Sequence, residues 1–317
     1  MAVTANTQQT YAQIGRRESL EDFIYDISPM ETPFVKGCKR MKAKAVYEEW
    51  LTDSLASANK DNAAVEGDTV SNDATIQTVR IGNYVQLLDK VIAVSSTADA
   101  VSTAGRKKEL SLQLSKRGRE IKRDIEAMAL SINASSAGSA STARKSAGVG
   151  AWLTTNTSHG SGGSANGFSG GIVSAPTDGT NRPLTETLFK AVIADCWDAG
   201  GDPSKVFCNS SQKQVISGFS GIATLYREST GTKQATIMGA ADVYVSDFGN
   251  HTIIPDRFMP TDGIYCIDPE FWAIKTLQPM MVEKLAKDGH ANRRMLSTEL
   301  VLASLNEAAS GGVFDLS

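Results

Sequence analysis

The sequence predicts an α+β fold in which a folded body carries extended segments. Three observations support this class. Residues 104–133 repeat apolar side chains at helical spacing, residues 46–94 form two extended halves around a polar middle, and residues 183–250 alternate short helices with short strands. With 41% apolar residues among 317, the chain can bury a sizeable core and form one or two domains.

Composition and charge narrow the class of protein. The net charge of −3 does not predict nucleic-acid binding by the chain as a whole, so such a contact would need a local patch. No stretch approaches the roughly 18 apolar residues that span a membrane, and the polar N-terminal residues lack the apolar core of a signal peptide. We therefore expect a protein that is made and kept in a cytoplasm, with no membrane partner.

Residues 1–35 are predicted to form an extended N-terminal arm that ends in the sequence ISPMETPF. Pro29 and Pro33 favour extended backbone in the residues before them. An arm of this kind cannot bury itself, so we expect it to be disordered or to lie on another surface.

A basic segment, Lys36–Lys44, follows the arm with five lysine or arginine residues and no acid. One interpretation is contact with phosphates or with an acidic neighbouring subunit. The other is a solvated strand edge, where lysine side chains block pairing with a further strand. The sequence alone leaves both interpretations open.

Residues 46–94 are predicted to be two extended halves joined by a polar, acidic and turn-rich middle. Val79, Ile81, Val85 and Leu87 alternate, which places them on one face of a strand. The middle is too polar to pack in a core, so it is either a mobile hairpin tip or a hairpin that folds over a neighbouring molecule. We favour the second, because an isolated two-stranded ribbon is only marginally stable in water.

Residues 104–133 carry the strongest helical pattern, with an expected length of roughly 40 Å. Thr97 or Ser102 is expected to cap this helix, and Lys122 and Glu126 are expected to pair one turn apart. The opposite face has a net positive charge that suits nucleic acid, although a solvated face explains any single charge more simply. The apolar stripe consists of Leu110, Leu114, Ile121, Ile125, Met128 and Ile132.

The region after this helix, residues 134–182, is rich in Gly and Ser. Only Trp152, Leu153 and Phe168 are available there as apolar anchors. We predict a long surface insertion.

Residues 183–250 are predicted to form a compact α/β unit. Thr185 is expected to cap its first helix and Gly200 to stop it, and Ser210 or Ser211 is expected to begin the second helix. The predicted strands of this unit and of the rest of the chain are Lys205–Asn209, Ala241–Gly249, the residues around 271–280, and Arg293–Asn306.

No motif predicts a catalytic, cofactor-binding or metal-binding residue. Gly167–Gly171 matches the G-x-S-x-G pattern around Ser169, but a nucleophile elbow lies between a buried strand and a helix, and this match lies in the Gly/Ser-rich region. His159, His251 and His290 lack the spacing of metal ligands and are expected at surface or turn positions. The four cysteines are scattered and are expected to be buried free thiols.

A series of segments in order runs TYAQIGRRESLEDFIYDISPMETPF, VEGD, RIGNYVQ, the AGRKKEL…REIKRDIE helix, SDFGNHTIIPDRFM and LAKDG. This series resembles the major capsid proteins of tailed bacteriophages, which have the Hong Kong 97-type fold, and within them the SU10-type branch. The resemblance covers essentially the whole chain apart from the Gly/Ser-rich region. It implies a structural protein and no enzyme.

The resemblance also divides the chain into parts. These are an N-terminal arm, 1–35; an extended loop that overlaps the neighbouring subunit, 46–86; a peripheral domain, 87–182 and 256–306, with a spine helix 104–133 and the Gly/Ser-rich insertion 134–182; and an axial domain around five- and six-fold axes, 183–255 and 307–317.

The resemblance further implies a function and partners. The chain would self-assemble as pentamers and hexamers into the icosahedral shell around the double-stranded DNA genome of a tailed phage, with weak contact to DNA on the inner face. A portal protein, a separate scaffolding protein and in some shells a decoration protein would join it, in the cytoplasm of a host bacterium. A separate scaffolding protein is implied because the chain begins directly at the arm. No cross-link between Lys60 and Asn306 is expected, because only their residue types mark them.

Three alternatives remain open. An encapsulin-like cargo compartment shares the fold and would co-purify with a cargo enzyme. Another virion structural protein, such as a tail or decoration protein, would form tubes or trimers. A hydrolase that used Ser169 would lose activity in a Ser169→Ala variant.

Overall fold

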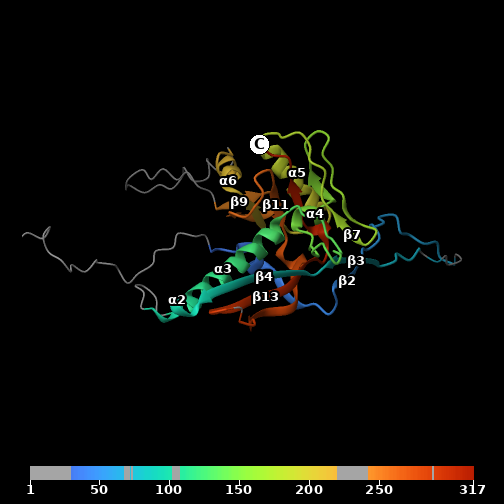
Figure 1. Cartoon of the computed structure of the whole chain (residues 1–317). Helices are drawn as coiled ribbons and strands as arrows, with labels where there is room; N and C mark the ends of the chain where they lie inside the picture. The colour runs from blue at the N-terminus through green and yellow to red at the C-terminus, as the bar shows by residue number, and fades with distance from the viewer. Residues whose placement is uncertain (1–29, 68–71, 73, 102–107, 220–241, 288) are drawn as a thin grey trace, which may run out of the picture.

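The computed structural model describes residues 30–67, 72, 74–101, 108–219, 242–287 and 289–317. Figure 1 shows a folded body of helices and sheets from which a narrow hairpin projects. The predicted α+β class is confirmed. Most of the predicted arm, residues 1–29, and the predicted helix start at residues 104–107 lie outside the described residues.

The first sheet has four strands in the order β1-β12-β13-β4. β12 and β13 form a long antiparallel pair, β4 is antiparallel to β13, and β1 is parallel to β12 at the opposite edge. The strands are β1 (Lys39–Lys42), β12 (Trp272–Lys284), β13 (Ala291–Ser304) and β4 (Gln86–Ser95). The strands predicted around 271–280 and at 293–306 are confirmed, with β13 starting and ending two residues earlier.

The long helix α3 (Glu109–Leu130) packs against this sheet. Ile121, Ile125 and Met128 of the predicted stripe are buried in a core that also includes Leu296 of β13. The helix is shorter than the predicted range 104–133. It ends at Leu130 because the next residue has extended backbone, and Lys108 at its start is extended as well.

The start of α3 is stabilised by a residue that the sequence analysis did not select. Asp99 Oδ1 accepts a hydrogen bond from the N–H group of Leu110 at 3.3 Å. Thr97, one of the two predicted caps, lies instead within the short helix α2 (Ser96–Ala100), and the other, Ser102, lies outside the described residues.

The second sheet has six strands in the order β5-β14-β11-β8-β10-β9. The helix α5 (Glu186–Asp198) packs on β5 and β14, and α6 (Ser210–Ser217) packs on β10. The strands are β5 (Asn156–Ser158), β14 (Gly311–Val313), β11 (Ile264–Ile267), β8 (Lys205–Cys208), β10 (Gly249–Pro255) and β9 (Val243–Ser246). This sheet therefore draws on four separate parts of the sequence. Two 3₁₀ turns, η3 (Pro269–Phe271) and η4 (Glu307–Ala309), flank the long β12–β13 pair.

Local sequence signals explain the two helices of this sheet. Thr185 Oγ1 accepts a hydrogen bond from the N–H group of Leu188, which confirms the predicted cap of α5, and Gly200 with a φ of 89° follows its last turn. α6 begins at Ser210, as predicted, and the residue before it, Asn209, caps the helix by accepting a hydrogen bond from the N–H group of Gln212. The strand predicted at 241–249 corresponds to the shorter β9, and β10, which begins at Gly249, pairs with it as a hairpin.

The Gly/Ser-rich insertion, residues 134–182, is built into the body, and the prediction of a surface loop is wrong for its central part. α4 (Val149–Trp152) is buried, and β5 pairs with β14. Small residues permit this packing, because a Cβ atom at Gly148 would overlap the backbone of Ser131. The insertion also contains a hairpin of two strands, β6 (Gly167–Ser169) and β7 (Ile172–Ser174).

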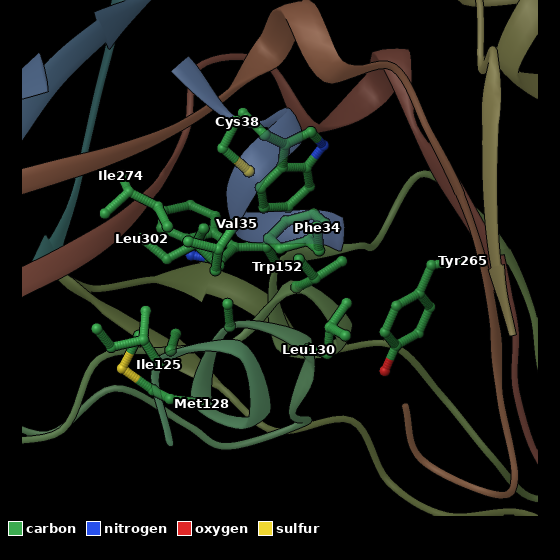
Figure 2. Close-up of a cluster of buried hydrophobic side chains, with 14 of the residues drawn as sticks. Phe34, Val35, Cys38, Ile125, Met128, Leu130, Trp152, Tyr265, Ile274 and Leu302 are labelled. Atoms are coloured by element: carbon green, nitrogen blue, oxygen red, sulfur yellow. The ribbon is translucent and has the colours of Figure 1, made fainter. Parts of the chain in front are cut away.

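The end of the predicted arm enters the main core. α1 (Pro33–Gly37) is a short helix where extended backbone was predicted, and it buries Phe34 and Val35. Figure 2 shows both side chains among those of α3 and β12. The Phe34 ring contacts Phe207 and Trp272 edge to face, with centroids 5.5 and 6.2 Å away.

The projecting hairpin consists of β2 (Tyr47–Thr52) and β3 (Val79–Tyr84). The continuous strand predicted through this region is interrupted at Val85, which separates β3 from β4 and donates its N–H to the Val46 carbonyl oxygen. Val85 is fully buried whereas Leu87 is 51% exposed, so the two residues do not share one environment.

Candidate functional site: the hairpin and its anchors

The hairpin is fixed to the body at its base by a tryptophan. Trp50 Nε1 donates a hydrogen bond to the Ser304 carbonyl oxygen at 2.7 Å, and Lys275 Nζ lies 4.6 Å from the centre of the Trp50 ring. Lys275 also pairs with Glu48 at 3.2 Å, and both side chains are largely buried. Because an unpaired charge would be costly there, this contact holds β2 in one position.

Two further contacts keep the hairpin base rigid. Burial raises the pKa of Glu48, but hydrogen bonds from the Lys44 N–H group and from Lys275 outweigh burial and bring the pKa below its usual value, so Glu48 is ionised at neutral pH. The rings of Tyr47 and Tyr84 lie 4.6 Å apart across the strands, and Tyr47 Oη donates a hydrogen bond to the carbonyl oxygen of Gly171 at 2.9 Å. The base is therefore joined both to the first sheet and to the insertion.

The hairpin tip, residues 53–78, has the opposite character. All of its described residues are exposed and none belongs to a strand. The tip nevertheless carries large apolar side chains, with Leu55 97%, Val65 74% and Ile76 50% exposed. The tip therefore presents apolar side chains that its own chain leaves uncovered, on a hairpin whose base is fixed to the body.

The end of the arm is held by a buried carboxylate on α3. Glu126 Oε1 and Oε2 accept hydrogen bonds from the N–H groups of Phe34 and Val35 at 2.7 and 2.9 Å. Glu126 is fully buried. The predicted pairing of Lys122 with Glu126 on a solvated face is therefore wrong, because Glu126 points into the core where it ties the arm to the helix.

A second buried carboxyl group, Asp256, lies beside Glu126. Burial, with a further contribution from Asp256, raises the pKa of Glu126 to about 8, against the opposing effect of the hydrogen bonds from Phe34 and Val35. Burial also raises the pKa of Asp256. The two groups therefore favour a state in which a proton is bound between them at neutral pH.

β1, the central part of the basic segment Lys36–Lys44, forms the outer edge of the first sheet. β1 pairs with β12 on one side only, and all four of its residues are exposed. β1 is therefore an exposed edge strand, the geometry that both interpretations of this segment require.

Asp315 ties the insertion to the C-terminal end of the chain. It adopts a φ of 57°, which only a few residue types tolerate, and its carboxylate accepts hydrogen bonds from the N–H groups of Gly179 and Gly160 at 2.7 and 2.8 Å. His159 Nδ1 lies 3.4 Å from this carboxylate, and the His159 ring stacks on Phe314. Burial lowers the pKa of His159, so the neutral ring serves packing here and the predicted surface position is wrong.

The other residues considered for chemistry do not form a reactive site. His251 is fully buried, with its ring nitrogens 2.7 Å from Ser246 Oγ and from the Pro203 carbonyl oxygen, so its predicted surface position is also wrong. His290 is exposed, as predicted. Ser169 ends β6 at the turn of a hairpin, which lacks the strand-to-helix geometry of a nucleophile elbow.

The cysteines and the wider search for metal sites give a similar result. All four cysteines are free and buried, as predicted. Among the described residues, no three His, Cys, Asp or Glu side chains are placed together to hold a metal ion. No helix in the described part of the chain is long and apolar enough to cross a membrane.

Comparison with known proteins decides the family. The family model for the SU10 major capsid protein matches residues 3–317. The chain belongs to the SU10 major capsid protein family. Membership makes it a structural protein of a tailed-phage capsid, and the predicted resemblance is confirmed.

Relatives of this capsid protein agree in sequence and in fold. The major capsid protein of Escherichia phage Phieco32 is 29% identical, with 96% of each chain covered. The capsid of Cyanophage A-1(L) matches with a TM-score of 0.67 at 13% identity, covering 95% of this chain and 97% of that chain. The holo-SrpI encapsulin from Synechococcus elongatus matches with a lower TM-score of 0.55 at 11% identity, with 93% of each chain covered. The fold is of the Hong Kong 97 type, as predicted.

Sequence reasoning missed the residues that hold this capsid subunit together. Glu126 was predicted to pair with Lys122 and Asp315 was not singled out, although each accepts hydrogen bonds from two backbone N–H groups far along the chain. One signal was available for Glu126, since it lies one residue after Ile125 of the apolar stripe and close to the buried face of the helix.

Proposed function

We propose that this capsid protein self-assembles as pentamers and hexamers into a closed icosahedral shell around the double-stranded DNA genome of a tailed phage. The observation that supports this is the hairpin, which is rigid at its base and exposed along its tip. A segment of this kind cannot be stabilised by its own chain, so its apolar side chains gain a packed environment only on a neighbour.

Assembly then follows from repetition of one contact. Each subunit places its tip on the next, so buried area accumulates over many copies, and interfaces of obligate assemblies often exceed about 2,000 Å². Closed symmetry allows one chain to fill every position. Because the base of the hairpin is held by Trp50 and Lys275, little of the binding free energy is lost in ordering it.

We assign the parts of the chain on the same basis. The arm is residues 1–35 and the overlapping loop is 46–86. The first sheet with α3 corresponds to the peripheral domain and the six-stranded sheet with α5 and α6 to the axial domain. In this assignment β5 of the insertion and β11 belong with the axial sheet, although the division by sequence placed both in the peripheral part.

Partners of the shell are proposed from the same family. They are a portal protein, a separate scaffolding protein and in some shells a decoration protein, with assembly in the cytoplasm of the host bacterium. The acidic balance of the chain supports weak contact with packaged DNA, because a container that bound its genome tightly would hinder release.

Electron microscopy of the protein, expressed alone and together with its genomic neighbours, tests this function. Closed icosahedral particles are expected in at least one of the two preparations. A monomer, a small ring or a tube under all conditions would contradict the proposal and favour another virion part. An enzyme that co-purifies inside the particles would favour an encapsulin-like compartment.

A further inference from the structure

We propose that the acidic hairpin tip of one subunit docks on the basic segment Lys36–Lys44 of a second copy of the chain. This inference rests on the proposed shell and specifies where the tip binds on its neighbour. It joins two surfaces that are unpaired within one molecule and opposite in charge.

The basic segment offers the first of these surfaces. Lys36, Lys39, Lys42 and Lys44 are exposed, and within the described part of the chain none of their ammonium groups makes an ion pair. β1 is an edge strand with β12 as its one neighbour in the sheet. Its outer side therefore presents both positive charge and a strand edge to an incoming segment.

The hairpin tip offers the second surface. Asp53, Asp61 and Glu66 are exposed, and none of the three carboxylates forms an ion pair with another described residue. Over residues 53–78 the sequence holds five acids and a single cation, Lys60. The tip is therefore acidic where the segment is basic, which gives the contact electrostatic complementarity.

The described residues of the tip do not lie on the basic segment of their own chain. Figure 1 shows the hairpin projecting away from the body. The segment ends beside the hairpin base, where the Lys44 N–H group donates to Glu48 and the base is fixed by Trp50. Each half of the tip, about 13 residues, extends up to roughly 40 Å outward from that base, which is far enough to meet a neighbouring copy. The partner is therefore another copy.

The contact joins two different surfaces, so it is heterologous. Contacts of that type generate closed rings when the rotation between copies closes. Rings are what pentamers and hexamers require. The basic segment could in principle bind either DNA or the acidic tip of another copy. We favour the tip, because binding of DNA to the segment would leave the acidic tip without a partner.

Charge-reversal variants test the proposed docking of the tip on the basic segment. One variant reverses the segment with Lys39→Glu, Lys42→Glu and Lys44→Glu, and a second reverses the tip with Asp53→Lys, Asp61→Lys and Glu66→Lys. A third combines all six changes, which restores complementarity with the signs exchanged. The matched control reverses three exposed lysines elsewhere, Lys122, Lys284 and Lys287, to Glu.

The yield of shells is measured by sedimentation and electron microscopy, with circular dichroism and thermal unfolding of the free subunit to confirm folding. Each single-surface variant is expected to lower the yield about tenfold or more, because like charges then face each other, and the combined variant is expected to return to within about threefold of the original chain. The control is expected to assemble normally.

Several results would overturn the docking while leaving the shell function intact. These are normal shells from both single-surface variants, no recovery in the combined variant, or a control that fails as badly. If the segment variant forms normal shells that fail to package DNA, the basic segment contacts the packaged DNA and not the tip of a neighbour. If the original chain forms no shells, the proposed function itself fails.

Carbodiimide cross-linking of assembled shells gives an independent readout, because it joins lysine amines directly to neighbouring carboxylates. Mass spectrometry is expected to find peptides of 36–44 joined to peptides of 53–66 in shells and not in free subunits. Absence of that pair, alongside other inter-subunit cross-links, would contradict the docking.

Discussion

The insertion 134–182 and the hairpin tip 53–78 are similar in composition and opposite in environment. Both are polar and rich in turn-forming residues. The insertion contributes Trp152, Leu153 and Val173 to the main core, whereas every described residue of the tip is exposed. Polarity alone therefore does not decide whether a segment of this capsid protein is buried.

The difference lies in how the polar groups of each segment are satisfied. In the insertion, Ser135 Oγ accepts a hydrogen bond from the Val173 N–H group at 2.7 Å, and Asp315 accepts two more from glycine N–H groups. Glycines also allow its backbone to approach Ser131 closely. The described residues of the tip have few such internal partners, so water satisfies their polar groups, and apolar side chains such as Leu55 stay exposed.

The largest expected change in the free energy of unfolding comes from a substitution in the insertion. Trp152→Ala is expected to lower the free energy of unfolding of the free subunit by about 3–5 kcal/mol, because it removes a large buried ring. Leu55→Ala in the tip, the matched control, is expected to change it by less than about 0.5 kcal/mol. Urea unfolding measures both. Equal losses in the two variants would mean that the tip is also packed in the free subunit.

The arm end is expected to show an intermediate effect. Glu126→Ala leaves the N–H groups of Phe34 and Val35 without their acceptor, so we expect a loss on the order of 2 kcal/mol in the free energy of unfolding. Proteolysis of the arm near α1 is expected to accelerate in the same variant. An unchanged rate and stability would show that Glu126 does not hold the arm.

The same carboxyl pair predicts a dependence on pH. Because the pKa of Glu126 is raised from 4.5 to about 8, the folded chain holds a proton between these values that the unfolded chain releases. This contribution to the free energy of unfolding is present at low pH and is lost as pH rises toward about 8 and above. Unfolding measured from about pH 5 to about pH 9 should show this fall, and Glu126→Gln should reduce it. A slope that is identical in both chains would exclude Glu126 as the titrating group.

Substitutions in the tip are expected to lower the yield of shells without changing the stability of the free subunit. Leu55→Ser with Val65→Ser is expected to leave unfolding of the free subunit unchanged within about 0.5 kcal/mol, since both side chains are exposed. Shell yield should nevertheless fall, because the two side chains lose their packing on the neighbour. Lys122→Glu on α3 serves as a surface control. Full yield from the tip variant would remove the apolar part of the proposed contact.

No covalent cross-link between Lys60 of one subunit and Asn306 of another is expected. Lys60 is exposed in the tip, and the Asn306 side chain already accepts a hydrogen bond from the Ala308 N–H group. Purified shells boiled in detergent are therefore expected to run as a single monomer band. A ladder of covalent oligomers would show that the tip is cross-linked to a neighbour.

Elements with strong local signals were predictable from the sequence. The strand β12, the helix α3 and the Thr185 cap follow from local patterns and capping residues. The residues of β13 alternate only loosely, so a strand is predicted there because it would pair with its neighbours. The family could be predicted because several characteristic segments occur in the expected order along the chain, and the matched family model confirms it.

Features that depend on distant contacts were not predictable. The burial of Phe34 requires a carboxylate 92 residues away, and the burial of α4 requires small residues that let Gly148 approach Ser131. His159 and His251 follow polar turns in the sequence, yet each is enclosed by segments far along the chain. Composition within a window carries no information on such neighbours.

Electron microscopy of a chain in which a short linker replaces residues 54–73 tests the central claim most directly. The hairpin base remains intact in this variant, because Trp50 and its contacts lie outside the replaced range. The account predicts a soluble, folded subunit that forms no stable shells under conditions where the original chain does. Normal shells from the shortened chain would contradict the claim that the tip joins neighbouring subunits.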